Sequence, residues 1–251
     1  MSASSVKQRR EFLKATIWQQ VDFSRTDQHR GVAPPPLEAP APPEAKRITL
    51  AAPGSWQNVR VVGVETAIRR RESHRQYSAA PLEMDELSFL LWATQGIRAR
   101  IDAATALRTV PSAGARHALE THLCALNVNQ LEPAIYRYLP VRHQLVLEHS
   151  IPQLGRRLAA GAFEQQFLAE AAAVFVWAAV PYRMEWRYGA AAHKLIALDA
   201  GHVCQNLYLA CEAIGAGCCA VAAYHQQRMD ELLGLDGDEE FTIYMAAVGK
   251  L

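Results

Sequence analysis

The sequence lacks a long apolar run and carries almost no net charge. No stretch of roughly 18 apolar residues occurs in the 251-residue chain, so a membrane-spanning helix is not expected. The formal net charge is +1, whereas proteins that bind nucleic acid generally carry a basic excess. We therefore expect neither a membrane nor a nucleic acid among its partners.

Paired cysteine motifs are also missing. The chain has five cysteines, an odd number, and no C-x-x-C pair, so neither a disulfide framework nor a zinc site is expected. Four of the five lie in apolar runs, where cysteine packs as a small hydrophobic residue. This usage indicates a structural role in a reducing, cytoplasmic setting, with no bound metal.

The first residues resemble an export signal without completing one. QRREFLK at 8–14 has the twin-arginine pattern, but the polar ATIWQQVDFSRTDQHR follows where such a signal needs an apolar stretch. Residues 6–21 are therefore predicted to form a short amphipathic helix.

Six prolines within positions 34–43 predict that residues 22–57 are extended and hold neither helix nor sheet. This segment is either a disordered tether or an ordered arm that wraps a partner subunit. We accordingly divide the chain into a helix and Pro-rich arm (1–57) and a globular domain (58–251).

The globular part mixes helices and strands without a βαβ repeat, which favours the α+β class. Apolar patterns predict helices at 82–94, 153–173, 202–214 and 228–233, and strands at 121–128, 135–138, 144–147, 171–180, 218–223 and 242–248. The helix at 202–214 is apolar nearly all round, which is typical of a core or a subunit interface. Asp199 or Gly201 is its expected N-cap and Gly215 its end.

Two short stretches carry residues suited to a ligand. Arg71, Ser73 and Arg75 suit a phosphate, because guanidinium groups and a hydroxyl all donate hydrogen bonds to its oxygens. A solvated run of charge is the alternative. The small residues of TVPSAGARH at 109–117 allow the backbone to approach a flat or phosphorylated group, with an ordinary turn as the alternative.

Four motifs occur in a fixed order along the chain: R-x-S-x-R-x-Y at 71–77, PLxxxELSxLLWAxQG at 81–96, PSAGAxHxLE at 111–120 and DAGHVxQNLxLAxEAxG at 199–215. Together they resemble the FMN-dependent nitroreductase superfamily and, within it, the SagB-type (thiazole/oxazole-forming) dehydrogenases. The resemblance covers about residues 60–251, and TDQxxGVxPPP at 26–36 resembles the leading segment of standalone members.

The resemblance implies a nitroreductase-like α+β sandwich, with a central, mainly antiparallel sheet flanked by helices. It also implies an intertwined homodimer with FMN at the subunit interface. Arg71 and Ser73 would hold the FMN phosphate and ribityl chain. Arg75 would face the pyrimidine edge of the flavin, where a fixed cation stabilises the negative charge of the reduced ring.

The resemblance implies further cofactor contacts from a loop, a strand end and the last strand: Pro111, Ser112, Ala113, Gly114, Ala222, Ala223 and Lys250. The loop would approach the flavin ring, from the other subunit. The alanine pair would offer a backbone N–H to flavin N5, and the lysine would add charge at the phosphate.

The chain departs from the family pattern at three places. Glu72 replaces an Arg or His and either repels the phosphate or orients an arginine. Ala222-Ala223 replaces a pair that contains glycine. In the azoline dehydrogenases a Lys-Tyr pair is implicated in proton removal, whereas here Arg187 stands beside Tyr188.

Arg187 stays protonated to a pH above about 12 and cannot act as a general base. Tyr188 could do so only with a depressed pKa. The alternative for this segment is that its Trp and Tyr side chains pack a loop.

The leading hypothesis is an FMN-dependent oxidoreductase that transfers hydride to or from flavin N5 and oxidises an azoline or another C–N bond in a peptide or small molecule. No Rossmann G-x-G-x-x-G follows a strand, so NAD(P)H would bind only transiently over the flavin. Two alternatives remain: an NAD(P)H-dependent nitro or quinone reductase, and a non-catalytic flavin-binding subunit of a peptide-modifying complex.

Overall fold

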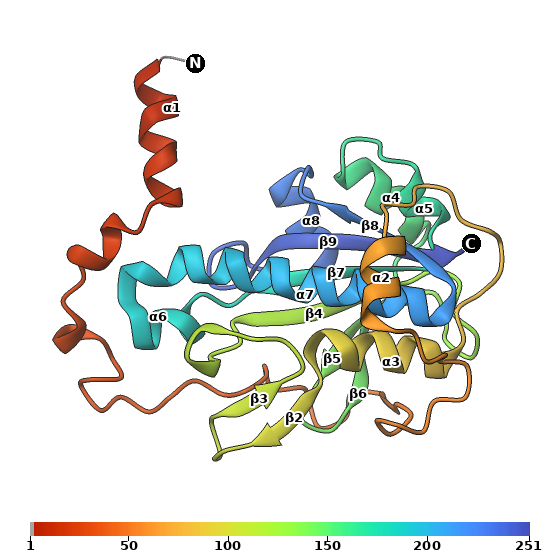
Figure 1. Cartoon of the computed structure of the whole chain (residues 1–251), viewed down its shortest axis with the longest axis horizontal. Helices are drawn as coiled ribbons and strands as arrows, with labels where there is room; N and C mark the ends of the chain where they lie inside the picture. The colour runs from red at the N-terminus through yellow and green to blue at the C-terminus, as the bar shows by residue number, and fades with distance from the viewer. Residues whose placement is uncertain (1–2) are drawn as a thin grey trace.

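One seven-stranded sheet organises the computed structural model, which describes residues 3–251 (Figure 1). Its order is β1-β6-β5-β4-β7-β9-β8, and all neighbouring strands pair antiparallel. The strands are β1 (Arg47–Thr49), β4 (Leu119–Ala125), β5 (Ala134–Leu139), β6 (Gln144–His149), β7 (Ala173–Ala179), β8 (Ala216–Val221) and β9 (Phe241–Lys250). The predicted α+β class and mainly antiparallel sheet are confirmed.

Helices cover both faces of this sheet (Figure 1). They are α1 (Ala3–Arg10), α2 (Val64–Arg70), α3 (Met84–Gln95), α4 (Leu154–Gly161), α5 (Phe167–Glu170), α6 (Tyr182–Tyr188), α7 (Ala192–Ile214) and α8 (Gln226–Leu233). A separate hairpin joins β2 (Ile97–Arg100) to β3 (Ala106–Arg108). Within residues 3–251, no helix combines the length and apolar character that crossing a bilayer requires.

The central strand β7 shows why helices cover both faces of the sheet. All seven of its residues are buried. Because side chains alternate along a strand, Phe175 and Trp177 join the core that α3 and α7 cover, whereas Val174 and Val176 join the core under α4, α5 and α8.

The long helix α7 differs from the prediction at its start. It begins at Ala192, so Asp199 and Gly201 lie inside it and neither is an N-cap. Residues 190–192 are three alanines, and alanine favours helix more than any other residue, so the helix extends well upstream of the predicted cap. Its predicted end is confirmed, because Gly215 takes the left-handed conformation with φ of 63°.

Three further predictions were wrong in their bounds. The helix expected at 6–21 ends at Arg10, and short 3-10 turns follow at η1 (Glu11–Leu13) and η2 (Thr16–Gln19). The helix expected at 153–173 is two helices, since Phe163 and Glu164 between them have positive φ. The segment 22–57 contains strand β1, which pairs with β6.

The Pro-rich arm lies on the body of its own chain, held by buried charged side chains. Arg108 donates to the Leu37 carbonyl at 2.6 Å, and Glu120 accepts from the Ala39 amide at 2.7 Å. Arg137 donates to the carbonyl oxygens of Ala39 and Pro40 at 2.8 and 3.0 Å. The arm thereby satisfies groups that would be costly to leave buried without partners.

Candidate functional site

The segment 71–75 leaves the end of α2 and reaches the edge strand β8. The His74 amide donates to the Cys218 carbonyl at 3.0 Å. Arg69 and Arg70 occupy the last turn of α2, where positive charges interact favourably with the helix dipole.

Tyr208 of α7 lies beneath this segment and contacts two of the residues that were predicted to bind a ligand. Its ring centroid is 5.3 Å from the Arg71 guanidinium carbon, and its hydroxyl is 2.9 Å from Ser73 Oγ. The same hydroxyl accepts from the Ala220 amide at 2.8 Å. When Tyr208 donates to Ser73, the serine hydrogen is free to point at a ligand oxygen.

Three other charged side chains near this segment, those of Arg75, Glu72 and Lys250, differ in their contacts with neighbouring residues. Arg75 is exposed and lies over Phe167, with its guanidinium carbon 5.9 Å from the ring centroid. Glu72 has a side chain that is 72% exposed, and its ion pair is with His74 at 3.7 Å, not with an arginine. Lys250 donates to Glu86 at 2.7 Å and to the Ile214 carbonyl at 2.6 Å.

Ala222 and Ala223 were predicted within the strand at 218–223, but β8 ends at Val221, so both lie beyond the strand and are exposed. Gln165 donates to the Ala223 carbonyl at 2.9 Å, so the alanine backbone is held in place beyond the sheet. A hollow of about 630 Å³ opens along residues 73–78 and Leu251. This region therefore gathers exposed donors of the kind an anionic group requires.

The loop 111–114 forms a second group, with Arg187 and Tyr188 of α6. A Cβ added at Gly114 would lie 2.7 Å from the Tyr188 hydroxyl and 2.8 Å from Arg187 Cδ and Nε. Gly114 has φ of 57° and is exposed. The structure thus brings together two motifs that lie more than 70 positions apart in the sequence.

Asp199 lies under this loop. Burial raises its pKa, and this outweighs the opposing effects of the Ser112 hydroxyl and the Ala113 amide. Its Oδ2 is buried without a hydrogen-bond partner among the described residues. The Ser112 hydroxyl also accepts from the His117 amide at 2.9 Å, which fixes the turn.

We expect Gly114→Ala to disturb this contact. The substitution adds the strain of a positive φ, about 1–2 kcal/mol in the free energy of unfolding, and pushes Arg187 and Tyr188 away. Gly31→Ala is the matched control, because Gly31 has φ of 74° and nothing within 4 Å of the added Cβ.

Urea unfolding should show a loss for both variants, larger for Gly114→Ala, and near-ultraviolet circular dichroism should change only for Gly114→Ala. Equal aromatic spectra in the two variants would contradict the contact.

The two groups lie along different parts of α7. Asp199 lies beside the loop group, which consists of residues 111–114 with Arg187 and Tyr188. Tyr208 lies beside the phosphate-type group, which consists of Arg71, Ser73 and Arg75. Asp199 and Tyr208 are nine positions apart in α7, which is about 13 Å along the helix axis. Figure 1 shows α6 beside the first part of α7 and α2 beside its last part. Within residues 3–251, one chain therefore presents two separated half-sites.

Three contributing residues were missed by sequence reasoning: Asp199, Tyr208 and Trp18. Asp199 and Tyr208 both lie within the motif at 199–215, but only the contacts of the folded chain connect them with the candidate site. Trp18 lies in the first 57 residues, yet its ring centroid is 5.8 Å from that of Tyr188. No local pattern links it to α6.

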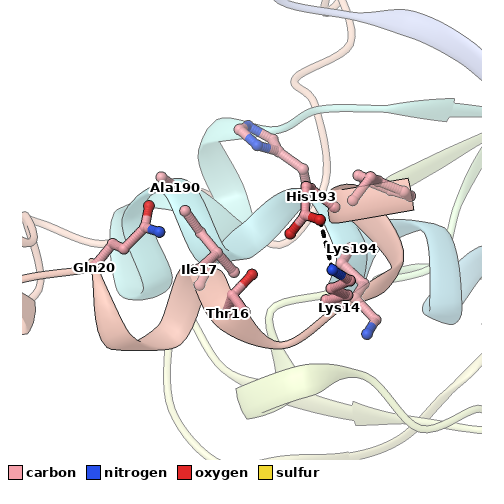
Figure 2. A pocket seen from close by; sticks show the side chains of 10 residues that line it. Lys14, Thr16, Ile17, Gln20, Ala190, His193 and Lys194 are labelled. Carbon is pink, nitrogen blue, oxygen red and sulfur yellow. Dashed lines mark hydrogen bonds and ion pairs between the residues drawn. The ribbon is translucent and has the colours of Figure 1, made fainter. Parts of the chain in front are cut away.

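Another hollow, of about 350 Å³, lies between the N-terminal segment and the start of α7 (Figure 2). Its charged groups already have partners. Lys14 pairs with Glu11 at 2.6 Å, and Lys194 donates to the Leu13 carbonyl at 2.5 Å. His193 is 2.8 Å from Glu185. Of these contacts, the one between Lys194 and the Leu13 carbonyl joins the segment to α7.

The five cysteines are buried and none forms a disulfide, in keeping with a structural role. No group of three or more His, Cys, Asp or Glu side chains that could hold a metal ion occurs within the part of the chain that the structure describes.

Comparison with known proteins gives a family match and several structural likenesses. Residues 68–250 match the Nitroreductase family. A Methanocaldococcus jannaschii protein, provisionally described as a nitroreductase, is 31% identical over 195 residues, which cover 77% of this chain and 93% of that protein.

Two solved structures resemble the fold over most of the chain. A Ralstonia eutropha JMP134 protein, also provisionally described as a nitroreductase, has a TM-score of 0.68 at 24% identity, covering 86% of this chain and 97% of its own. A chain of the E. coli microcin synthetase McbBCD complex, with truncated pro-MccB17 bound, has a TM-score of 0.60 at 19% identity, covering 100% of this chain and 98% of its own.

Proposed function

Because the chain belongs to the nitroreductase family, we propose that it is an FMN-dependent oxidoreductase of the SagB-type dehydrogenase kind. FMN supplies hydride chemistry at flavin N5 when it is bound. The single observation that carries the proposal is a set of donors along one short segment: half-buried Arg71 and exposed Ser73, which both contact Tyr208, and exposed Arg75. Their chemistry fits the phosphate and ribityl chain of FMN.

The loop at Gly114 fits the proposed flavin ring. Gly114 is exposed and carries no side chain of its own, and Asp199 faces the Ser112 hydroxyl and the Ala113 amide below the loop. Arg187 and Tyr188 border the loop, where they would orient a substrate and limit access of water. Ala222 and Ala223 present an exposed backbone for the contact proposed at N5.

We propose that the working form is a homodimer with FMN at the subunit interface. The separation of the phosphate-type and loop groups along α7 supports it, since one chain offers each half at a different place. Two copies related by a twofold axis would set the loop of one subunit against Arg71 and Ser73 of the other.

Lys250 is proposed as a secondary contributor near the phosphate. Its ammonium is engaged by Glu86 and the Ile214 carbonyl. In this position it would contribute charge without a direct bond.

The proposed substrate has a C–H next to nitrogen, in an azoline or another C–N bond of a peptide or small molecule. Arg187 replaces a lysine-like residue of the azoline dehydrogenases, so proton removal would fall to Tyr188 or to a group of the substrate. This replacement favours a second candidate, a non-catalytic flavin-binding partner in a peptide-modifying complex.

Anaerobic titration tests these candidates. We expect NAD(P)H or an azoline peptide to bleach the flavin absorbance of the holoprotein, and an added acceptor to restore it. Bleaching by NAD(P)H with turnover of nitroaromatics indicates a nitro or quinone reductase. A bound flavin that neither donor reduces contradicts an independent enzyme and favours the partner role.

A further inference from the structure

Arg187 has no partner for its charge among the residues that the structure describes. On α6 the ion pairs are made by Arg183, with Glu120, and by Glu185, with His193. Within residues 3–251, the Arg187 guanidinium makes neither an ion pair nor a hydrogen bond. Its guanidinium carbon lies 5.5 Å from the centroid of the Tyr188 ring.

A second guanidinium, that of Arg116, is near enough to Arg187 for the two positive charges to oppose each other. Burial lowers the pKa of Arg116, and the charge of Arg187 lowers it further. Arg116 is itself held by the Gly114 carbonyl at 3.3 Å and by Thr105 Oγ1 at 3.0 Å. The positive charges of Arg116 and Arg187 therefore both lie next to the loop 111–114. Arg116 is held by its hydrogen bonds, so Arg187 is the one of the two that is available to a ligand.

The nearby carboxylates are directed elsewhere. Asp102 lies near Arg116 and partly offsets its charge, whereas Asp199 faces the Ser112 hydroxyl and the Ala113 amide. Glu185 is 2.8 Å from His193. The protein thus leaves the anionic partner of Arg187 to be supplied from outside.

Aromatic surface adjoins the unpaired guanidinium. Trp18 packs edge-on against Tyr188 at 5.8 Å between centroids and is 39% exposed. Gly189, next to Tyr188, faces Val21 at 3.7 Å and Thr26 at 3.9 Å from a built Cβ. The N-terminal segment therefore borders the same place as Arg187, and it adds apolar area beside the charge.

We propose that Arg187 binds the carboxylate of an anionic substrate, and that the Trp18–Tyr188 surface packs against the apolar body of that substrate. The planar guanidinium matches a carboxylate through two parallel hydrogen bonds. The inference rests on the proposed function, because it places the substrate at the Gly114 loop. It gives Arg187 a role in recognition instead of proton removal.

A matched pair of probe molecules isolates the contribution of the substrate carboxylate to binding. Para-nitrobenzoate and para-nitrobenzamide share a ring and a nitro group and differ in the carboxylate. Calorimetric titration of the oxidised holoprotein should show the acid binding about 10- to 100-fold more tightly than the amide, the range for a charge-assisted bond. KM values for nitro reduction should show the same ratio.

Three variants identify the residue. Arg187→Gln should remove the preference for the acid and leave amide binding unchanged, and Arg187→Lys should retain part of it. Arg156→Gln is the control, because Arg156 is an exposed arginine on α4, outside both groups. Equal loss of acid and amide binding in Arg187→Gln would overturn the proposal, and so would a wild-type protein without preference.

The source of the carboxylate is resolved with N-acetylphenylalanine and its amide. Binding of this acid more tightly than the nitro acid indicates a peptide C-terminus, and the reverse indicates a small molecule. The visible spectrum distinguishes failure of the proposed function from failure of the inference about Arg187. Protein that binds no flavin but keeps the Arg187-dependent preference contradicts only the proposed function, whereas flavin-loaded protein without the preference contradicts only this inference.

Discussion

Glu120→Gln is expected to lower the free energy of unfolding by about 3–5 kcal/mol, the loss typical of removing one partner from a buried ion network. Glu120 is 2% exposed, forms an ion pair with Arg183 and lies 3.9 Å from Arg137. It also accepts the Ala39 amide. Glutamine keeps the shape but leaves the buried Arg183 guanidinium without its countercharge and removes one of the two carboxylates near Arg137.

Glu148→Gln is the matched control for this experiment. Glu148 is 2.7 Å from the same Arg137, but its side chain is 30% exposed, so its loss should cost less than about 1 kcal/mol. Urea unfolding with equal m-values in the three proteins measures both effects. Similar losses for the two variants would contradict a buried network centred on Glu120.

The pH dependence of this effect follows from the Glu120 pKa. Burial raises that pKa, but Arg183 and Arg137 more than compensate, so it lies below its ordinary value of 4.5 in the folded protein. A carboxyl with a depressed folded pKa stabilises the protein above the unfolded pKa, and this contribution is lost as the pH falls through the folded value. Wild type and Glu120→Gln should therefore converge in stability in acid.

Arg71→Ala is expected to raise the Kd of FMN about 10- to 100-fold, as the loss of a charge-assisted phosphate contact predicts. Arg70→Ala is the control, because Arg70 is an exposed neighbour on the last turn of α2 that forms no ion pair within residues 3–251. Titration of the apoprotein, followed by quenching of flavin fluorescence, gives both constants. Equal Kd values for the two variants would remove Arg71 from the site.

Glu72→Arg should act in the opposite direction and tighten FMN. Glu72 is largely exposed and pairs with His74, so it orients neither Arg71 nor Arg75. Its charge is then simply repulsive toward a phosphate. Weaker binding in this variant would show that the glutamate positions a ligand-binding arginine after all.

Six of the seven strands of the sheet were predictable because they are distinct in the sequence, whereas β1 lies in the segment 22–57 that was expected to hold no strand. The core strand Ala173–Ala179 is a continuous apolar run, and the last strand is apolar over most of its length. Such runs identify buried strands almost without context. Bounds were less accurate where alanines extended α7 upstream and where two positive-φ residues divided the helix expected at 153–173.

The motifs of the candidate site can be found in the sequence, whereas the contacts around them cannot. Local spacing indicated Arg71, Ser73, Arg75 and the 111–114 loop. The support from Tyr208 depends on how α7 packs, and the Trp18 contact depends on an arm that buried charges hold in place. A sequence pattern carries no signal for pairs so far apart, because tertiary packing alone determines their distance.

The most direct test of FMN binding is the visible spectrum of the purified protein, with identification of the chromophore that denaturation releases. We expect the absorption bands of oxidised flavin and the release of FMN, one molecule per chain. A colourless protein that stays colourless after incubation with FMN would contradict the proposed function.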